Sequence, residues 1–463
     1  MTQSRSESDG RLNTILVRNI NIVYPENEGE DIVLRTSSCV FIKGGRIAAV
    51  DEAISDTKAD IVIDGTGKWL VPGYIDTHVH FFQSANPYTR PDVIDLTKLV
   101  PYEHENARNR ARLHATLRTW LACGVTGVMD MGGPFWNFKV RDEADKLENA
   151  PQVLVTGPLF SMIADAPLEL DDPPIIKVST VDEVRTLAER QLVHKPNWLK
   201  VWFIHMPQDD LAGQEEVVKE VGRLAHEAGL PMAVHATELE TAKAALRSGA
   251  DILVHSVSDK PVDDEFLRLA AERRVIYSPT LYVPRGYAEV LSRNWKPTRE
   301  EERFGDPEIL AHMQDVERLS ESDIPERILP VFRSKGEASP PAMLARWQTA
   351  EQNLMRVWNS GITVALATDA GNIGTLHGPS IFREMGLMSH AGLSPVQILR
   401  CATANGAKAM GLEGEVGRIT VGYRADMVIL NSNPLETIEN ASDIAHVIRN
   451  GRIFSAEELI SNR

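Results

Sequence analysis

Hydrophobic residues follow a strand–helix rhythm through the middle of this chain. Short apolar, β-branched runs alternate with longer segments in which apolar residues recur at helical spacing. The pattern predicts strands at residues 73–79, 125–131, 152–156, 198–204, 231–236, 251–256, 274–280 and 362–368. Helices are predicted between them, for example at residues 181–193, 213–228, 238–248 and 263–273. Strand–helix units repeated in this way indicate an α/β fold, a (β/α)₈ TIM-type barrel.

The two ends of the chain have a different, strand-rich pattern. Residues 14–70 contain short β-branched runs separated by Gly, Asn and Asp, with a hairpin signal at KGGRI, and the C-terminal segments GRITVGYRADMVILN and HVIRNGRIF are similar. We therefore predict one small β-sandwich domain formed by both ends, from residues 1–70 and 411–463, around a barrel at residues 71–410. The charged, proline-rich segment 282–345 is too long for a connector and is predicted to be a helical insertion or lid.

Composition and charge exclude several classes of partner. The 463 residues are 43% hydrophobic and 25% charged, as in ordinary globular proteins. A formal net charge of −16 disfavours nucleic acid and anionic membranes. The N-terminal segment is polar, and no apolar run is long enough to span a bilayer. We expect a cytoplasmic homo-oligomer with a small-molecule substrate, in which Cys39, Cys123 and Cys401 are buried and unpaired.

A pair of histidines gives the first chemical signal. His78 and His80 are one residue apart on the first predicted strand of the barrel. Because side chains alternate along a strand, both imidazoles point to the same side. Two imidazoles on one side can hold a divalent metal ion such as zinc, although a lone His-Xaa-His is weak evidence.

Four further polar residues stand at or near the C-terminal ends of later strands, where barrel enzymes place their active sites. They are Lys200, His235, His255 and Asp369. An ammonium group at Lys200, flanked by apolar residues, is costly to bury unless it is paired or chemically altered. A neutral lysine amine can capture carbon dioxide, and the resulting carbamate can bridge two metal ions. The structural alternatives are a salt-bridged Lys200, a substrate-polarising His255 and a helix-capping Asp369.

These residues in this order resemble the amidohydrolase superfamily, and in particular its prolidase-like and imidazolonepropionase-related members. The resemblance rests on VPGYIDTHVHF, Lys200, His235, His255, ATDAG and the C-terminal GRITVGYRADMVIL. It implies that His78, His80 and Asp369 hold one metal ion and that His235 and His255 hold a second. Carboxylated Lys200 and a hydroxide would bridge the two ions, with Zn²⁺ expected and Fe²⁺ or Mn²⁺ as alternatives.

One departure leaves the number of metal ions open. Many prolidase-like relatives carry a second histidine soon after the one on the fifth strand, but here the segment is His235-Ala-Thr-Glu238. This His-Xaa-Xaa-Glu resembles the mononuclear deaminase branch, in which the glutamate shuttles protons. The ordinary alternative for Glu238 is an acidic residue in the first turn of a helix.

The expected reaction is hydrolysis of an amide, urea or carbamate C–N bond by a metal-bound hydroxide, with catalytic roles for Asp369, His255 and Lys200. Aromatic segments follow several strands, which favours a small aromatic substrate such as an aryl urea or anilide, as in phenylurea hydrolases. Candidate substrate contacts near the strand ends are Trp136, Trp202, His205, Tyr282 and His377. Alternatives are an Xaa-Pro or N-acyl-amino-acid hydrolase, for which Arg285 and Tyr282 can clamp the carboxylate, a ring deaminase, and an inactive scaffold. The complete ligand set argues against the scaffold.

Overall fold

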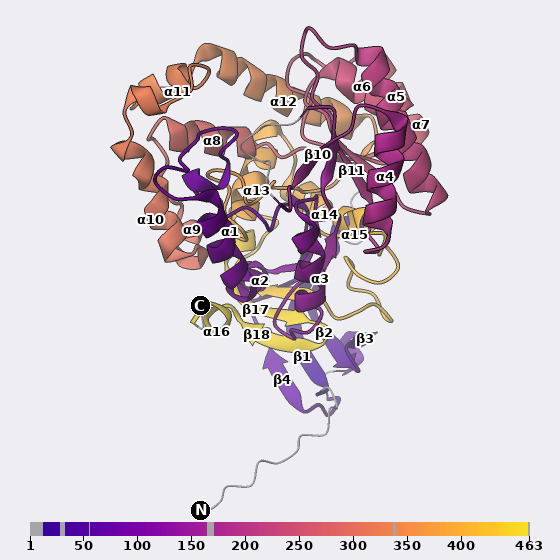
Figure 1. Cartoon of the computed structure of the whole chain (residues 1–463). Coiled ribbons are helices and arrows are strands. Elements are labelled where there is room, and N and C mark those ends of the chain that lie inside the picture. The colour runs from indigo at the N-terminus through magenta and orange to yellow at the C-terminus, as the bar shows by residue number, and fades with distance from the viewer. Residues whose placement is uncertain (1–12, 28–32, 55, 164–170, 337–338, 462–463) are drawn as a thin grey trace, which may run out of the picture.

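A computed structural model describes residues 13–27, 33–54, 56–163, 171–336 and 339–461 (Figure 1). The polar N-terminal segment at residues 1–12 lies outside the described residues. In the described part, no helix is both long enough and apolar enough to cross a bilayer. The three cysteines are buried, as predicted, and form no disulfide among the described residues.

Parallel strands form the centre of the molecule. One sheet contains β6 (Tyr74–Val79), β7 (Val125–Asp130) and β8 (Gln152–Val155). The other has the order β10 (Ile175–Lys177), β9 (Leu159–Ser161), β11 (Leu199–Trp202), β12 (Met232–His235), β13 (Ile252–Val254), β14 (Ile276–Ser278) and β15 (Thr363–Val364). Each predicted strand of the barrel contains one of these strands. The short β9 and β10 were not predicted.

Backbone hydrogen bonds link the two parallel sheets. Next to β6 and β15, Thr77 N donates to Leu366 O over 3.0 Å and His80 N donates to Ala370 O over 2.8 Å. Next to β8 and β11, Asn197 N donates to Val155 O over 2.9 Å. The arrangement is a TIM-barrel-type α/β fold, in which the C-terminal ends of the strands meet on one face.

Helices surround these sheets. The four predicted helices are confirmed as α4 (Val181–Leu192), α5 (Leu211–Glu227), α6 (Leu239–Arg247) and α7 (Asp264–Arg273). The remaining helices outside the insertion are α1 (Tyr102–Ala111), α2 (Leu113–Ala122), α3 (Phe138–Ala144), α13 (Ser380–Ala391), α14 (Pro395–Cys401), α15 (Ala404–Ala409) and α16 (Ala456–Ser461). Most of these helices pack their apolar sides against the buried strands in one large hydrophobic core, and α15 packs in a second cluster through Ala407 and Ala409.

Strands from both chain ends pair in a single sheet. Its order is β18 (Arg452–Ser455), β17 (Ile444–Arg449), β16 (Met427–Leu430), β5 (Trp69–Pro72), β1 (Ile15–Val23), β2 (Leu34–Lys43) and β3 (Arg46–Val50), and β4 (Ile61–Asp64) also pairs with β1. The antiparallel pair β5–β16 joins the two ends. The KGGRI hairpin is present, with positive φ at Gly44 and Gly45. A second sandwich layer and the predicted domain boundaries stay predictions.

The insertion is helical, as predicted. It contains α8 (Val283–Leu291), α9 (Arg299–Phe304), α10 (Pro307–His312) and α11 (Leu329–Arg333) and leads into α12 (Pro341–Asn359). Val290, Ile309 and Phe332 pack with Tyr88 and Ile94 from the segment after β6 in a separate hydrophobic cluster. Figure 1 shows these helices at the opposite end of the molecule from β1–β4. The insertion is thus part of the packed structure on the strand-end side.

Candidate metal centre

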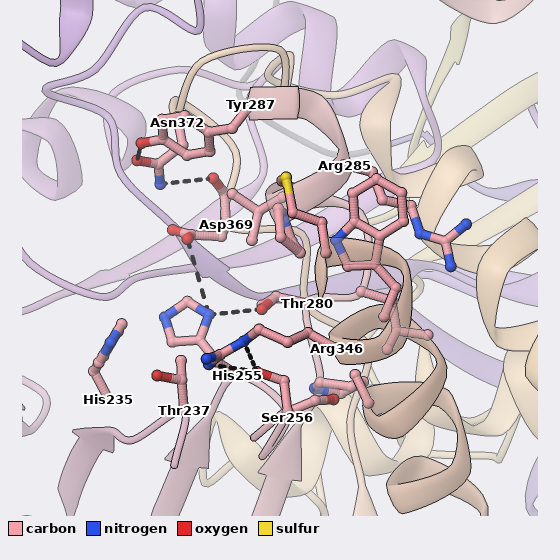
Figure 2. Close-up of a pocket in the computed structure, with 18 of the residues that line it drawn as sticks. His235, Thr237, His255, Ser256, Thr280, Arg285, Tyr287, Arg346, Asp369 and Asn372 are labelled. Carbon is pink, nitrogen blue, oxygen red and sulfur yellow. Dashed lines mark hydrogen bonds and ion pairs between the residues drawn. The ribbon is translucent and has the colours of Figure 1, made fainter. Parts of the chain in front are cut away.

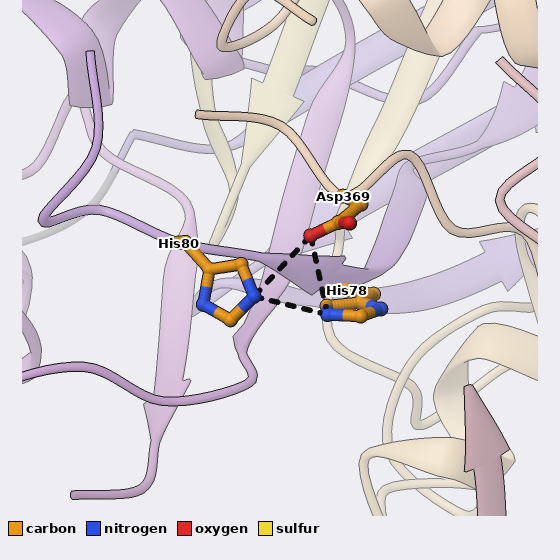
Figure 3. A group of neighbouring side chains, drawn as sticks. All are labelled: His78, His80 and Asp369. Atoms are coloured by element: carbon orange, nitrogen blue, oxygen red, sulfur yellow. Dashed lines mark hydrogen bonds and ion pairs between the residues drawn. The ribbon is translucent and has the colours of Figure 1, made fainter. Parts of the chain in front are cut away.

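Two imidazoles and one carboxylate meet where the first and last parallel strands end (Figure 3). His78 lies on β6, His80 directly follows it, and Asp369 lies in the segment after β15. The Nε2 atoms of His78 and His80 are 3.2 Å apart. Asp369 Oδ1 lies 3.3 Å from His78 Nε2 and 3.2 Å from His80 Nε2. All three side chains are buried, so the structure brings together the residues predicted for the first metal ion.

A backbone carbonyl determines how His80 presents its ring. His80 Nδ1 lies 2.6 Å from Gly132 O. Because a carbonyl oxygen can only accept, Nδ1 carries a hydrogen, which leaves Nε2 as the nitrogen that can bind a metal ion. Partners of this kind orient the histidines that bind metal ions. Asp130, whose carboxylate accepts from Gly132 N over 3.1 Å, supports the carbonyl in turn.

His235 and His255 lie beside this cluster. Their ring centroids are 4.3 Å apart, and the ring of His255 is 4.8 Å from that of His78. His255 Nδ1 lies 2.6 Å from Thr280 Oγ1 and 4.0 Å from Asp369 Oδ2. Burial lowers the pKa of His78, His235 and His255 well below the usual value, which favours the neutral imidazole that binds metal ions.

Lys200 completes the predicted set. It lies on β11, is only 1% exposed, and its Nζ has no hydrogen-bond partner among the described residues. Burial lowers the pKa of the amine to about 7, and the carboxylate of Asp369 opposes that shift. A small cavity of about 70 Å³ is lined by Lys200 together with the four histidines and Asp369. The amine therefore faces the same space as the other candidate ligands.

Three non-glycine residues at the site have a left-handed backbone. The φ angles are 74° at His255, 47° at Thr280 and 60° at Asp369. Each such residue costs about 1–3 kcal/mol, and such strain clusters at functional sites. Gly371, at φ 107°, is required for space as well, because a Cβ there would lie 2.5 Å from His80 O. The backbone thus holds these side chains at an energetic cost.

Asp76 holds the two strands on which the cluster depends, and the sequence analysis did not single it out. Its Oδ1 accepts from His78 N and from Thr368 N, each over 3.1 Å, and its Oδ2 accepts from Thr368 Oγ1 over 2.6 Å. Burial raises the pKa of this carboxyl to about 7. A carboxyl in an otherwise buried strand, two residues before His78, was the signal available in the sequence.

A second polar network supports Asp369 from the insertion. Arg90 Nη1 donates to Asn372 Oδ1 over 2.6 Å and to Tyr287 Oη over 3.0 Å. Tyr287, on α8, donates to Asn372 Oδ1 over 2.6 Å, and Asn372 Nδ2 donates to the backbone carbonyl of Asp369 over 3.2 Å. Asp92 binds the remaining side of the Arg90 guanidinium. The network joins the segment after β6, the insertion and the segment that carries Asp369.

The donor set fits a divalent metal ion. Asp369 Oδ1 and Lys200 Nζ are buried without hydrogen-bond partners in the described part of the chain, and His78 Nδ1 is a third such atom. Native proteins rarely leave buried polar atoms unpaired, and the binding of an ion at such atoms is one of the usual reasons. Imidazole and carboxylate suit Zn²⁺ and also Mn²⁺ or Fe²⁺.

A larger cavity opens directly beside the small one (Figure 2). It measures about 410 Å³ and shares His235, His255, Asp369, Arg90, Trp202 and Asn372 with the small cavity. Its other walls are mostly apolar and come from the segments after β13 and β14, from α8 and from α12. A ligand in the larger cavity therefore lies against the candidate metal ligands.

Comparison with known families shows to which family the chain belongs. The model of the amidohydrolase family matches residues 69–454, which is most of the sequence. The chain belongs to the amidohydrolase family. It is an enzyme of that family, as the residues predict.

Several relatives and solved structures match this enzyme over nearly its whole length. A 5'-deoxyadenosine deaminase from Methanothermobacter thermautotrophicus is 23% identical over 437 residues, covering 90% of this chain and 88% of the relative. The structure of a Xaa-Pro dipeptidase with bound methionine has a TM-score of 0.71 at 20% identity, covering 96% of this chain and 100% of that chain. Phenylurea hydrolase B has a TM-score of 0.69 at 19% identity, with 97% and 98% covered. These likenesses between structures confirm the fold.

Four of the five predicted substrate residues line neither cavity. Trp136 lies under the guanidinium of Arg110, and His205 bonds Gln214 through Nδ1. Tyr282 is buried with its hydroxyl on Glu289. His377 is buried as well, donates to Gln83 O over 2.8 Å and stacks on Phe81. The fifth, Trp202 at the end of β11, lines both cavities.

A substitution at Tyr287 tests whether the polar network around Asn372 supports the site. Tyr287→Phe removes the hydroxyl that bonds Asn372 and Arg90, which loosens the segment that carries Asp369. We expect kcat to fall about tenfold, the equivalent of about 1.4 kcal/mol, while metal content stays unchanged. Tyr423→Phe, whose hydroxyl bonds Glu413 O in a distant part of the enzyme, is the control and should keep full activity. An unchanged kcat in Tyr287→Phe would show that this network does not support the function of the site.

Glu384 gives the fold a pH dependence. It accepts from Leu281 N and Tyr282 N, each over 2.8 Å, beside the larger cavity. Burial raises the pKa of its carboxyl from 4.5 to about 8, so its stabilising contribution is complete below pH 4.5 and is lost as the pH rises to about 8. We expect the free energy of unfolding, measured with urea between about pH 5 and about pH 8, to fall less steeply with pH in Glu384→Gln than in wild type. The two slopes should differ by at most about 1.4 kcal/mol per pH unit. Equal slopes would mean that Glu384 is charged in the folded enzyme.

Proposed function

We propose that the enzyme is a metal-dependent hydrolase that cleaves the C–N bond of an amide, urea or carbamate in a small substrate with an aromatic or apolar group. The observation that carries the proposal is the shared wall between the two cavities. The cluster of candidate ligands borders an apolar space of about 410 Å³, which is the size of a small-molecule site. Trp202 and Trp347 line that space and can pack against an aromatic ring.

The metal-binding roles follow from the donor atoms. His78, His80 and Asp369 would hold one ion, and His235 and His255 would hold a second. Lys200 would bridge them as a carbamate, formed when its neutral amine adds carbon dioxide and releases a proton. The low pKa of Lys200 makes the neutral amine available. A bound divalent ion supplies Lewis acidity, which makes water a stronger nucleophile and a carbonyl more electrophilic.

The side chains of the enzyme would then transfer protons and polarise the carbonyl group of the substrate. Asp369 turns Oδ1 toward His78 and His80, which leaves Oδ2 to accept a proton from the attacking water and return it to the leaving nitrogen. His255 borders both cavities and is oriented by Thr280, so it can polarise the carbonyl of the substrate. Neutral imidazoles nearby keep the charge of Asp369 available for this role.

The placement of Glu238 disfavours the ring-deaminase alternative. Glu238 occupies the N-cap position of α6 and lines neither cavity, whereas Thr237 before it does line the larger one. A proton shuttle must lie within hydrogen-bond reach of the reacting atoms or one water away. This supports the ordinary alternative, an acidic residue at the start of a helix.

The same proposal includes the wider architecture. The two parallel sheets would close into one barrel between residues 71 and 410, and residues 1–70 and 411–463 would form the small domain. We also propose that the enzyme assembles as a homo-oligomer, and light scattering can test this.

A substrate panel tests the reaction. Anilides, phenylureas and carbamates should be cleaved by protein prepared with zinc and bicarbonate. His78→Asn should lose at least about 100-fold in activity and most of the first metal ion, because one ligand of the coordination sphere is gone. Metal analysis and product release measure the two effects. Near-normal activity of His78→Asn without added metal would contradict the assignment.

Lys200 and Glu238 distinguish the two branches of the family. Lys200→Ala should lose the second metal ion and most activity, and a short carboxylic acid such as acetate should partly restore both. Glu238→Gln should keep its metal and remain within about threefold of wild-type activity, because the side chain lies outside the cavities. The reverse result, a fully active Lys200→Ala with one metal ion and an inactive Glu238→Gln, would replace the binuclear proposal with a deaminase-type site.

A further inference from the structure

The larger cavity gathers positive charge in an acidic protein. Three arginines, Arg90, Arg285 and Arg346, line it, and Asp369 is the one acidic residue among its lining side chains in the described part of the chain. The whole chain has a net charge of −16. A concentration of cations in a concave apolar space attracts an anionic ligand.

Two of these arginines already form ion pairs with acidic side chains of the protein. Arg90 makes a two-bond pair with Asp92, and Arg285 pairs with Glu351. Arg346 differs, because within the residues that the structure describes it has no acidic partner. Its Nε and Nη2 donate instead to the hydroxyl of Ser258 over 3.2 and 3.0 Å.

Arg346 lies in the larger cavity, outside the small cavity that all the candidate ligands share. It projects from α12, which also contributes Met343, Trp347 and Ala350 to the lining at helical spacing. Figure 2 shows the side chain reaching toward the strand ends that carry His255. Arg346 and Ser258 line the larger cavity but not the small one, whereas His255 lines both. A substrate with its C–N bond at the ligands would place its far end near Arg346.

We propose that Arg346 binds a carboxylate of the substrate, with help from Ser258. This inference rests on the proposed function and narrows it to amides that have an aromatic or apolar body and a free carboxylate, such as an N-aroyl amino acid. A guanidinium offers a planar pair of donors that matches a carboxylate. Because the Ser258 oxygen accepts from Arg346, its own hydroxyl hydrogen is free to donate to the same carboxylate.

Matched substrates test the inference in the metal-loaded enzyme. N-benzoylphenylalanine carries the carboxylate on the amine side, and N-phenylsuccinamate carries it on the acyl side. Each is compared with its neutral primary amide. Arg346→Ala should lower kcat/KM for a carboxylate substrate by about 10- to 100-fold, mainly through KM, and should leave the neutral amide unchanged. Arg346→Lys should retain an intermediate value, because it keeps the charge but loses the planar fork.

Arg268→Ala provides the matched control. Arg268 is an exposed arginine on α7 that pairs with Glu272 and does not line the cavity, so the control should keep the wild-type preference. The acid that loses most in Arg346→Ala identifies which side of the amide carries the carboxylate. Equal loss for the acids and their amides, or no loss for either, would overturn the inference.

A binding measurement separates this inference from the proposed reaction. Isothermal titration of the full-length protein with 3-phenylpropionate and with 3-phenylpropionamide reports on the cavity without any hydrolysis. Wild type should bind the carboxylate at least about tenfold more tightly than the amide, and Arg346→Ala should abolish that difference. Equal binding by wild type would overturn the carboxylate clamp even if hydrolysis occurs. The predicted difference without hydrolysis of any panel substrate would leave the clamp in place and contradict the proposed reaction.

Discussion

The site is organised around the buried carboxylate of Asp369, which faces the imidazoles of three candidate metal ligands. Asp369 Oδ1 lies 3.3 Å or less from two imidazole nitrogens and has no hydrogen-bond partner in the described structure. Burial keeps the neighbouring His78 and His255 neutral, so these rings do not supply a compensating charge. Leaving a carboxylate in this state costs several kcal/mol. A divalent cation bound between these side chains would remove that cost, which supports the proposed metal site.

The strained backbone follows from this requirement. Asp369 must turn from β15 toward β6, and it does so with a positive φ, while its N–H donates to His78 O over 2.7 Å. Asp76 ties β6 to the same segment through Thr368, and Gly371 leaves room for the carbonyl of His80. The junction of the first and last parallel strands is therefore the part of the fold in which conformational strain and polar bonding are concentrated.

The sequence predicted what depends on local pattern and residue type. Strands buried on both sides appear as apolar runs, and polar residues at their ends stand out, which is why His78, His235 and Asp369 could be found. β9 and β10 could not, because three residues are too few to show a period. Arg90, Tyr287 and Asn372 were missed because their hydrogen bonds join residues 197 and 282 positions apart. Aromatic segments suggested Trp136 and Tyr282 as substrate contacts, but those side chains point into other packing environments.

The proposed chemistry of this enzyme and its proposed substrate preference depend on different parts of the structure. The small cavity, which holds the candidate ligands, is built largely from the strand ends of the barrel-type fold. The larger cavity takes much of its wall from α8 and α12, which belong to or directly follow the insertion. Changes in those helices can alter the shape and charge of the larger cavity without moving the ligands. Structures with TM-scores of 0.69–0.71 to this chain are named for substrates as different as phenylureas and Xaa-Pro dipeptides, because a shared fold does not determine which substrate its site accepts.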